Sequence, residues 1–232
     1  MPAHAQPQQQ PSPVVVEFFN GTKASVAGAK KVVPPGEAFF SGLKKVFPAE
    51  NLILLKEISA YPGLSRQTAD FLAYRNVRYR MVNKLPLSGE PLLILDGVLL
   101  VKGERADVAS AISKLKKDQR QPMKLEAVRS KERIKVSVDL VFREHFSEGT
   151  RILLLVTESA PVPTPVLQVV DSGYLAPGHR GPQEQVIKLD RSWFDGRSSM
   201  PLRVVALLQR EGDKEILSAA QTEVVVKPYA LF

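Results

Sequence analysis

The chain has 232 residues, of which 44% are hydrophobic and 24% charged, a composition typical of folded proteins rather than disordered or fibrous ones. It contains no cysteine, which excludes disulfides, thiol catalysis and thiolate metal sites. The net charge of +8 favours anionic partners, but the basic residues lie in short pairs among acidic ones, so nucleic acid is not the expected partner.

Residues 1–13 are polar and proline-rich, which predicts a flexible leader. Within them, Ala3-His4-Ala5 has the small-x-small form of a signal-peptidase site. No basic and apolar segment precedes it, which would follow from a trimmed signal peptide, from a misplaced gene start, or from a chance match. We expect a periplasmic or secreted protein. No apolar run is long enough for a transmembrane helix, so any envelope association would be at the membrane surface.

The first half of the chain alternates short apolar runs with segments of helical periodicity. Strands are expected at 14–19 and 51–58, and helices at 38–46, 65–76 and 105–117. Before the last of these helices, apolar residues on both sides of Asp96-Gly97 predict a β-hairpin over 91–101. This order predicts an α/β domain that spans residues 14–118.

Beyond a linker at 119–122 the pattern changes to closely spaced strands without a convincing helix. Turn residues such as Glu148-Gly149 and Gly212-Asp213 separate several of them. The expected strands are 124–128, 134–142, 151–157, 166–170, 185–189, 202–209 and 216–227. This spacing predicts an antiparallel, β-sandwich-like domain over residues 124–228.

The first half has the element order of a thioredoxin fold, with Pro91 in the place of the cis-proline. The chain also resembles a family of secreted bacterial and plant proteins of unknown function, in which a thioredoxin-like domain precedes a β-rich domain. The resemblance rests on four segments: Val16 to Phe19, Pro34 to Ala38, Pro91 to Ile112, and Val204 to Gln209 together with Ile216 to Ala220. It implies a thioredoxin-like N-terminal domain followed by an antiparallel sandwich.

The chain departs from that family at its redox site. Lys30 and Val33 occupy the two cysteine positions, and Glu90 replaces the threonine before the proline. The segment from Glu57 to Tyr61 lacks the family's histidine and aspartate. The resemblance therefore implies a redox-inactive, vestigial groove, formed by Lys30, Val33, Pro34, Pro35, Glu57, Tyr61, Glu90 and Pro91.

No other catalytic or cofactor site is expected. His4, His145 and His179 are far apart and lack metal-ligand spacing, and no phosphate-binding loop is present. Glu17, Glu57 and Glu90 could face one another as paired carboxylates do in glycosidases, although salt-bridged or solvated acids are the simpler interpretation. Trp193 and Phe194 are candidate interface aromatics, with packing of a turn as the alternative.

These observations favour a non-enzymatic protein that serves as a protein-binding or structural accessory subunit, with an unidentified protein partner. One alternative is a hydrolase that uses carboxylates or histidine, which would need ionisable groups to converge in a cleft. Another is electrostatic adhesion to an anionic polymer or lipid, which high salt would abolish. The oligomeric state does not follow from the sequence.

Overall fold

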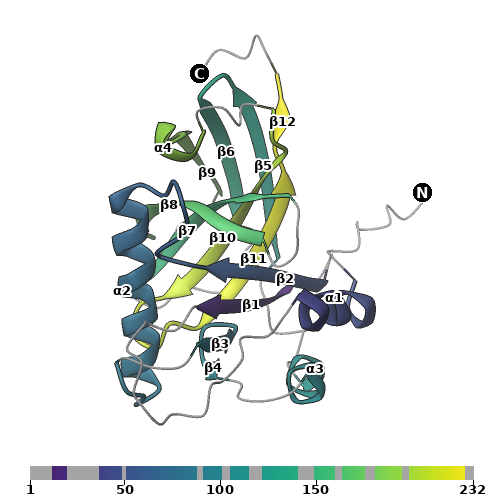
Figure 1. Ribbon diagram of the computed structural model, residues 1–232. Helices are drawn as coiled ribbons and strands as arrows, with labels where there is room; N and C mark the ends of the chain where they lie inside the picture. The colour runs from purple at the N-terminus through teal and green to yellow at the C-terminus, as the bar shows by residue number, and fades with distance from the viewer. Residues whose placement is uncertain are drawn as a thin grey trace, which may run out of the picture.

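Two β-sheets, one of eight strands and one of four, make up most of the structure (Figure 1). The computed structural model describes residues 12–19, 37–48, 51–87, 91–100, 105–114, 122–140, 149–159, 164–175, 181–194 and 199–227. The helices are α1 (Glu37–Val46), α2 (Arg66–Val82), α3 (Arg105–Lys114) and α4 (Arg191–Phe194). The strands are β1 (Val14–Phe19), β2 (Leu52–Glu57), β3 (Leu92–Leu95), β4 (Leu99–Leu100), β5 (Met123–Ser130), β6 (Arg133–Leu140), β7 (Thr150–Glu158), β8 (Thr164–Tyr174), β9 (Gly181–Lys188), β10 (Leu202–Arg210), β11 (Ile216–Glu223) and β12 (Val225–Val226).

The eight-stranded sheet draws strands from both halves of the chain, in the order β11-β10-β7-β8-β2-β1-β3-β4. β1 pairs with β2 in parallel and with β3 antiparallel. The two halves meet where β2 pairs with β8 in parallel, through Leu55 opposite Thr164 and Lys56 opposite Pro165. Main-chain pairing therefore runs across the point at which the sequence predicts a domain boundary.

β1 is buried on both faces, which explains its nearly continuous apolar sequence. Val14, Val16 and Phe18 pack with side chains of α1 and α3 on one face of the sheet. On the other face, Val15 belongs to a cluster that includes Leu72 of α2. The alternation of a strand thus places Glu17, which lies between Val16 and Phe18, on the face that α2 covers.

The four-stranded sheet, in the order β12-β5-β6-β9, packs against the β7–β10 part of the larger sheet. Alternate residues of β6 point inward and are buried, and they meet apolar residues of β7 and β10 in one cluster. Trp193 and Phe194 of α4 belong to the same cluster, and their rings pack edge to face with centroids 5.7 Å apart. The guanidinium of Arg129 lies 4.7 Å from the Phe194 ring centroid.

The fold class predicted from the sequence, a thioredoxin-like α/β domain followed by an antiparallel sandwich, is wrong. The described chain is mostly β, with few helices and no clear α/β thioredoxin domain at its N-terminus. Both sheets are mixed, because the larger one holds parallel and antiparallel pairs and β12 joins β5 in parallel. The physical reason is long-range pairing, since β8, β7, β10 and β11 extend the sheet that β1–β3 begin.

The predicted hairpin at Asp96-Gly97 also links the two halves. Asp96 accepts a hydrogen bond from the Val15 amide on its Oδ1 at 2.8 Å, and its carbonyl accepts one from the Ile216 amide at 2.8 Å. In this turn Asp96 has a φ of +52° and Gly97 a φ of +78°, the positive values that a tight hairpin turn requires. A Cβ on Gly97 would lie 1.8 Å from the Lys214 carbonyl oxygen, so only glycine fits here.

Candidate functional site

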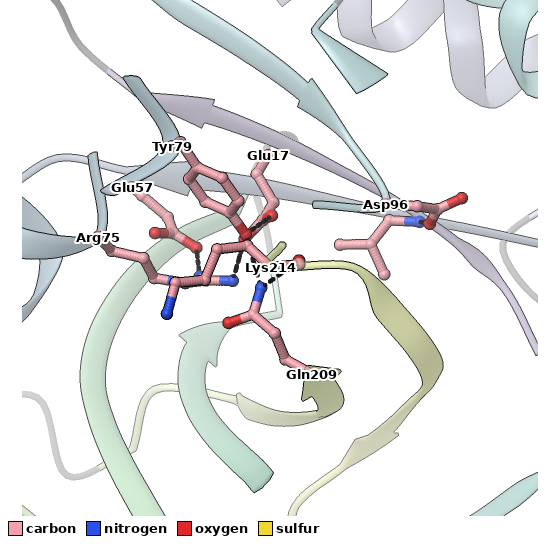
Figure 2. A network of polar contacts seen from close by, with 8 residues as sticks. Glu17, Glu57, Arg75, Tyr79, Asp96, Gln209 and Lys214 are labelled. Atoms are coloured by element: carbon pink, nitrogen blue, oxygen red, sulfur yellow. Dashed lines mark hydrogen bonds and ion pairs between the residues drawn. The ribbon is translucent and has the colours of Figure 1, made fainter. Parts of the chain in front are cut away.

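A cluster of charged and polar side chains is buried between α2 and the eight-stranded sheet (Figure 2). The Arg75 guanidinium contacts carboxylates from both central strands, Glu17 at 2.6 Å and Glu57 through a second ion pair. Arg75 also donates a hydrogen bond to the Tyr79 hydroxyl at 3.0 Å. That hydroxyl donates to Glu17 at 2.7 Å. The cluster therefore ties one turn of α2 to β1 and β2.

Gln209 of β10 extends this buried cluster toward the C-terminal strands. Its Nε2 donates hydrogen bonds to the Tyr79 hydroxyl at 2.9 Å and to the Lys214 carbonyl at 2.7 Å. The Lys214 ammonium is itself buried and pairs with Glu211 at 2.5 Å. Burial lowers the pKa of Lys214, and the pairing with Glu211 opposes that effect. The cluster thus joins the same regions as the Asp96 hairpin.

The environment of the cluster changes the acidity of its members. Burial raises the pKa of Glu57 well above its usual range; the Arg75 charge opposes this shift, and Glu17 adds to it. Burial also raises the pKa of Tyr79. For Arg75, the nearby carboxylates outweigh burial and raise the pKa further. Glu57 therefore keeps its proton to a higher pH than an exposed carboxyl would, which limits the charge buried under α2.

The cluster is closed to solvent. The exposed fractions of Glu17, Glu57, Arg75 and Tyr79 lie between 0% and 3%. A substrate could not reach the two carboxylates without displacing α2, so the arrangement is suited to positioning the helix rather than to catalysis. Within the described ranges, no group of three or more His, Asp or Glu side chains is placed to bind a metal ion.

The outward face of α2 is the more accessible feature. Tyr74, Val77 and Met81 are 50%, 36% and 53% exposed, and their i, i+3, i+7 spacing puts them on one side of the helix. We call this surface the α2 outer face. The buried side of the same helix holds Arg75 and Tyr79. α2 therefore departs from the usual pattern of a surface helix at these positions, because Arg75 points inward beside Leu72 while three apolar side chains point to solvent.

The structure describes part of the predicted vestigial groove. Lys30, Val33, Pro34, Pro35 and Glu90 lie outside the described residues. Glu57 and Pro91 lie at the same end of the sheet, because Glu57 and Leu92 both pair with Phe19, from opposite sides. Tyr61 is half-buried against the core between the two sheets.

The structure also accounts for some of the other residues that the sequence singled out. Trp193 and Phe194, the candidate interface aromatics, are 2% and 6% exposed and pack in the core between the sheets. His145 and His179 lie outside the described residues. Glu17 and Glu57 do come together, and each forms an ion pair with Arg75. Arg75, Tyr79 and Gln209 were not expected from the sequence, although an arginine and a tyrosine four residues apart on one helix face were a usable signal.

Comparisons with known proteins bear on the fold alone. No family model and no curated protein matches the chain. A crystal structure of an Agrobacterium tumefaciens protein, a structural-genomics target, is similar over 97% of this chain and 99% of that one, with a TM-score of 0.51 and 13% identity. The likeness spans both halves, so the mixed two-sheet arrangement is shared over the full length. The thioredoxin-like family expected from the sequence stays a prediction.

Two further structures match shorter parts of the chain. The match with a domain of the outer membrane lipoprotein Omp28 from Porphyromonas gingivalis spans 47% of this chain and 90% of that domain, with a TM-score of 0.32 and 11% identity. A superoxide reductase from Ignicoccus hospitalis covers 45% of this chain and 80% of the enzyme, with a TM-score of 0.29 and 18% identity. At these TM-scores neither likeness carries a functional argument. Among the described helices, none is long and apolar enough to cross a membrane.

Proposed function

We propose that this chain is a non-enzymatic accessory subunit that binds another protein through the α2 outer face. The supporting observation is the group of three exposed apolar side chains on a helix whose opposite side is anchored by the buried Arg75. Exposed apolar residues that gather on one surface are typical of interaction sites, and tyrosine is enriched among residues that dominate binding energy. The proposal keeps the protein-binding role expected from the sequence but moves it away from the vestigial groove.

Rigidity of the helix supports the same proposal. The ion pairs and hydrogen bonds of Arg75 and Tyr79 fix the rotation of α2 about its axis. Ser65 caps the helix, because its side chain accepts a hydrogen bond from the Thr68 amide at 3.3 Å. A surface held in this way loses little conformational entropy on binding, which favours affinity.

Charge defines the chemistry of the partner. The chain carries a net charge of +8, and the half-buried Arg78 and the exposed Lys84 lie on or just after α2. We therefore propose an acidic protein partner with an apolar surface that accepts Tyr74, Val77 and Met81. Complementary charge would speed association, whereas the apolar contacts would supply most of the affinity.

The test is co-purification from native extract with a photo-crosslinking residue at position 74 or 81. A matched control places the same residue at Val225, which is 54% exposed on β12. The proposal predicts a stoichiometric, acidic partner that crosslinks from α2 and is lost in the Tyr74→Ser/Met81→Ser variant but retained in Val225→Ser/Val226→Ser. Equal loss in both variants, or a monomer without crosslinks at positions 74 and 81, would contradict it.

We propose neither of the alternatives expected from the sequence, a hydrolase or adhesion to an anionic polymer or lipid. The two carboxylates that converge are paired with Arg75 and closed to solvent, which gives a carboxylate hydrolase no access to substrate. Adhesion to an anionic polymer is supported by net charge alone. Export from the cytoplasm stays a prediction, and localisation of an epitope-tagged native protein by cell fractionation would test it.

A further inference from the structure

A pocket of about 200 Å³ lies between the two sheets, on the side of the larger sheet that α2 does not cover. Its floor consists of Val138, Ile152 and Leu154. Ser172 of β8 and Gln183 and Gln185 of β9 also line it. Glu184 of β9 completes the lining, so the pocket combines an apolar floor with a polar rim, as ligand sites commonly do.

The rim residues occupy positions at which a sandwich interior is normally apolar. β9 pairs with β6 so that Ile187 lies opposite Ile134, Gln185 opposite Val136, and Gln183 opposite Val138. The β6 residues and Ile187 are buried, so the two glutamines share the inward face of the four-stranded sheet. Packing does not require amides here, since valine or leucine would fill the same space.

The hydroxyl of Ser172 strengthens the case for a ligand. Its Oγ is buried and has no hydrogen-bond partner among the described residues. A buried hydroxyl without a partner is costly, and a bound polar group would remove that cost. The charge of the lining residue Glu184 is compensated, because its carboxylate pairs with Lys135 at 2.8 Å.

Two strand edges border the pocket. Among the described strands, β9 is the last of its sheet, and β8 beyond Pro165 pairs only with β7. At one end the side chain of Gln168 bridges the two edges. Its Nε2 donates a hydrogen bond to the Lys188 carbonyl at 2.9 Å, and its Oε1 accepts one from the Asp190 amide at 3.0 Å. At the pocket, no described strand pairs with this edge of β9, which is the arrangement that an added strand requires.

We propose that this pocket binds an uncharged, extended peptide segment, which adds to the edge of β9 and inserts one apolar side chain. The floor has room for a side chain such as leucine, and the rim offers Ser172, Gln183 and Gln185 to the peptide amides. A charged side chain would lose its hydration over the apolar floor, and Glu184, already paired with Lys135, would not compensate for that loss. This site is independent of the α2 outer face, because the pocket and α2 lie on opposite faces of the larger sheet.

The experiment is an NMR titration of the full chain, with methyl labels on Val, Leu and Ile and detection of glutamine side-chain amides. The probes are the peptides Ac-Ser-Leu-Ser-NH2, Ac-Ser-Ser-Ser-NH2 and Ac-Ser-Asp-Ser-NH2, and the single residue N-acetyl-leucinamide. The leucine peptide is expected to shift the Val138, Ile152 and Leu154 methyls and to bind at least about ten-fold more tightly than the serine peptide. The aspartate peptide is expected not to bind.

Two matched variants locate the site. Gln185→Phe places a ring at the inward position and should abolish binding, whereas Val186→Phe changes the next, outward residue and should leave it intact. Ser172→Ala, which preserves the packing, should weaken binding by about three-fold to ten-fold. Unchanged spectra away from the pocket show that each variant is folded.

Three outcomes would overturn the proposal. Equal affinities for the leucine and serine peptides would show that the apolar floor does not contribute to binding. Equal losses of affinity in Gln185→Phe and Val186→Phe would place the binding site elsewhere. If N-acetyl-leucinamide binds as tightly as the tripeptide and the β9 amides gain no protection from hydrogen exchange, strand addition is wrong. None of these results depends on whether the α2 outer face binds a protein.

Discussion

On one face of the eight-stranded sheet, α2 is held by ion pairs and hydrogen bonds, whereas on the other face the four-stranded sheet is held by apolar side chains. Directional contacts fix one rotation of the helix, while apolar packing is stabilising but less specific about orientation. The difference teaches that the helix is positioned rather than merely buried. That is what a helix needs if its outward side is to present a defined surface.

The sharpest way to break this comparison is to remove Arg75. Arg75→Ala leaves Glu17 and Glu57 buried without their cation, and we expect the free energy of unfolding to fall by about 4 kcal/mol. Chemical denaturation monitored by circular dichroism would measure it. The triple variant Glu17→Met/Glu57→Met/Arg75→Met is the control, because it removes all the charge and should recover most of the loss. If the triple variant is less stable than Arg75→Ala, the cluster is not held together by charge compensation.

Truncation of an apolar side chain in the core between the sheets provides the counterpart. Leu208 of β10 is fully buried, and Leu208→Ala should lower the free energy of unfolding by about 3 kcal/mol through lost burial and the cavity left behind. The same denaturation experiment measures it. Because the two sites lie on opposite faces, their effects should add in the double variant with Arg75→Ala. Strong non-additivity would mean that the two faces are coupled.

Gly97 tests the contact between the Asp96 hairpin and Lys214, which also joins the two halves of the chain. Gly97→Ala should lower the free energy of unfolding by about 2–3 kcal/mol, because a Cβ cannot fit 1.8 Å from the Lys214 carbonyl oxygen at this positive φ. Gly173→Ala is the matched control, since Gly173 has φ +83° but no atom within 4 Å of its added Cβ. It should cost only about 1 kcal/mol. Equal melting temperatures for the two variants would contradict the close contact at the hairpin.

The smallest expected effect is a dependence of stability on pH. The pKa of Glu57 is raised in the folded chain, so the folded state holds a proton that the unfolded state releases above its ordinary pKa of 4.5. The contribution of Glu57 to stability is therefore complete below that value and is lost as pH rises through the folded pKa, by at most about 1.4 kcal/mol per pH unit. Glu17, Arg75 and Tyr79 face this carboxyl. Glu57→Gln should flatten the slope in denaturation measured from pH 5 to 8, and an unchanged slope would assign it to other groups.

Local sequence patterns predicted individual elements better than their assembly. The Asp96-Gly97 hairpin was predicted because Asp-Gly separates two apolar runs, although its loop holds three residues, Asp96 to Val98. β1 was predicted because its apolar run is short and rich in valine. The pairing of Leu55 with Thr164 could not be predicted, because no local pattern encodes a contact between strands more than a hundred residues apart. The thioredoxin-like prediction failed at that contact.

The buried cluster was hidden for a related reason. A helix was expected over 65–76, whereas α2 extends to Val82 and buries both Arg75 and Tyr79, so the expected helix did not include Tyr79. An arginine in a helix normally predicts a solvent-facing side, unless its acidic partners on other elements are known. Glu17 and Glu57 supply those partners from strands 58 and 18 residues away from Arg75 in the sequence, as the numbering shows.

The contact between Ser12 and Ala219 has a consequence for how the chain acquires its structure. The Ala219 amide donates to the Ser12 hydroxyl at 2.8 Å, and that hydroxyl donates to the Ala219 carbonyl at 3.1 Å, so the two ends of the described chain are joined. During synthesis β1 can pair with β2 and β3 early, but the Ser12 contact and the pairing of β2 with β8 must wait for the C-terminal half to emerge. Closing such long loops is slow, which makes the nascent chain a natural client for chaperones that shield unpaired strands.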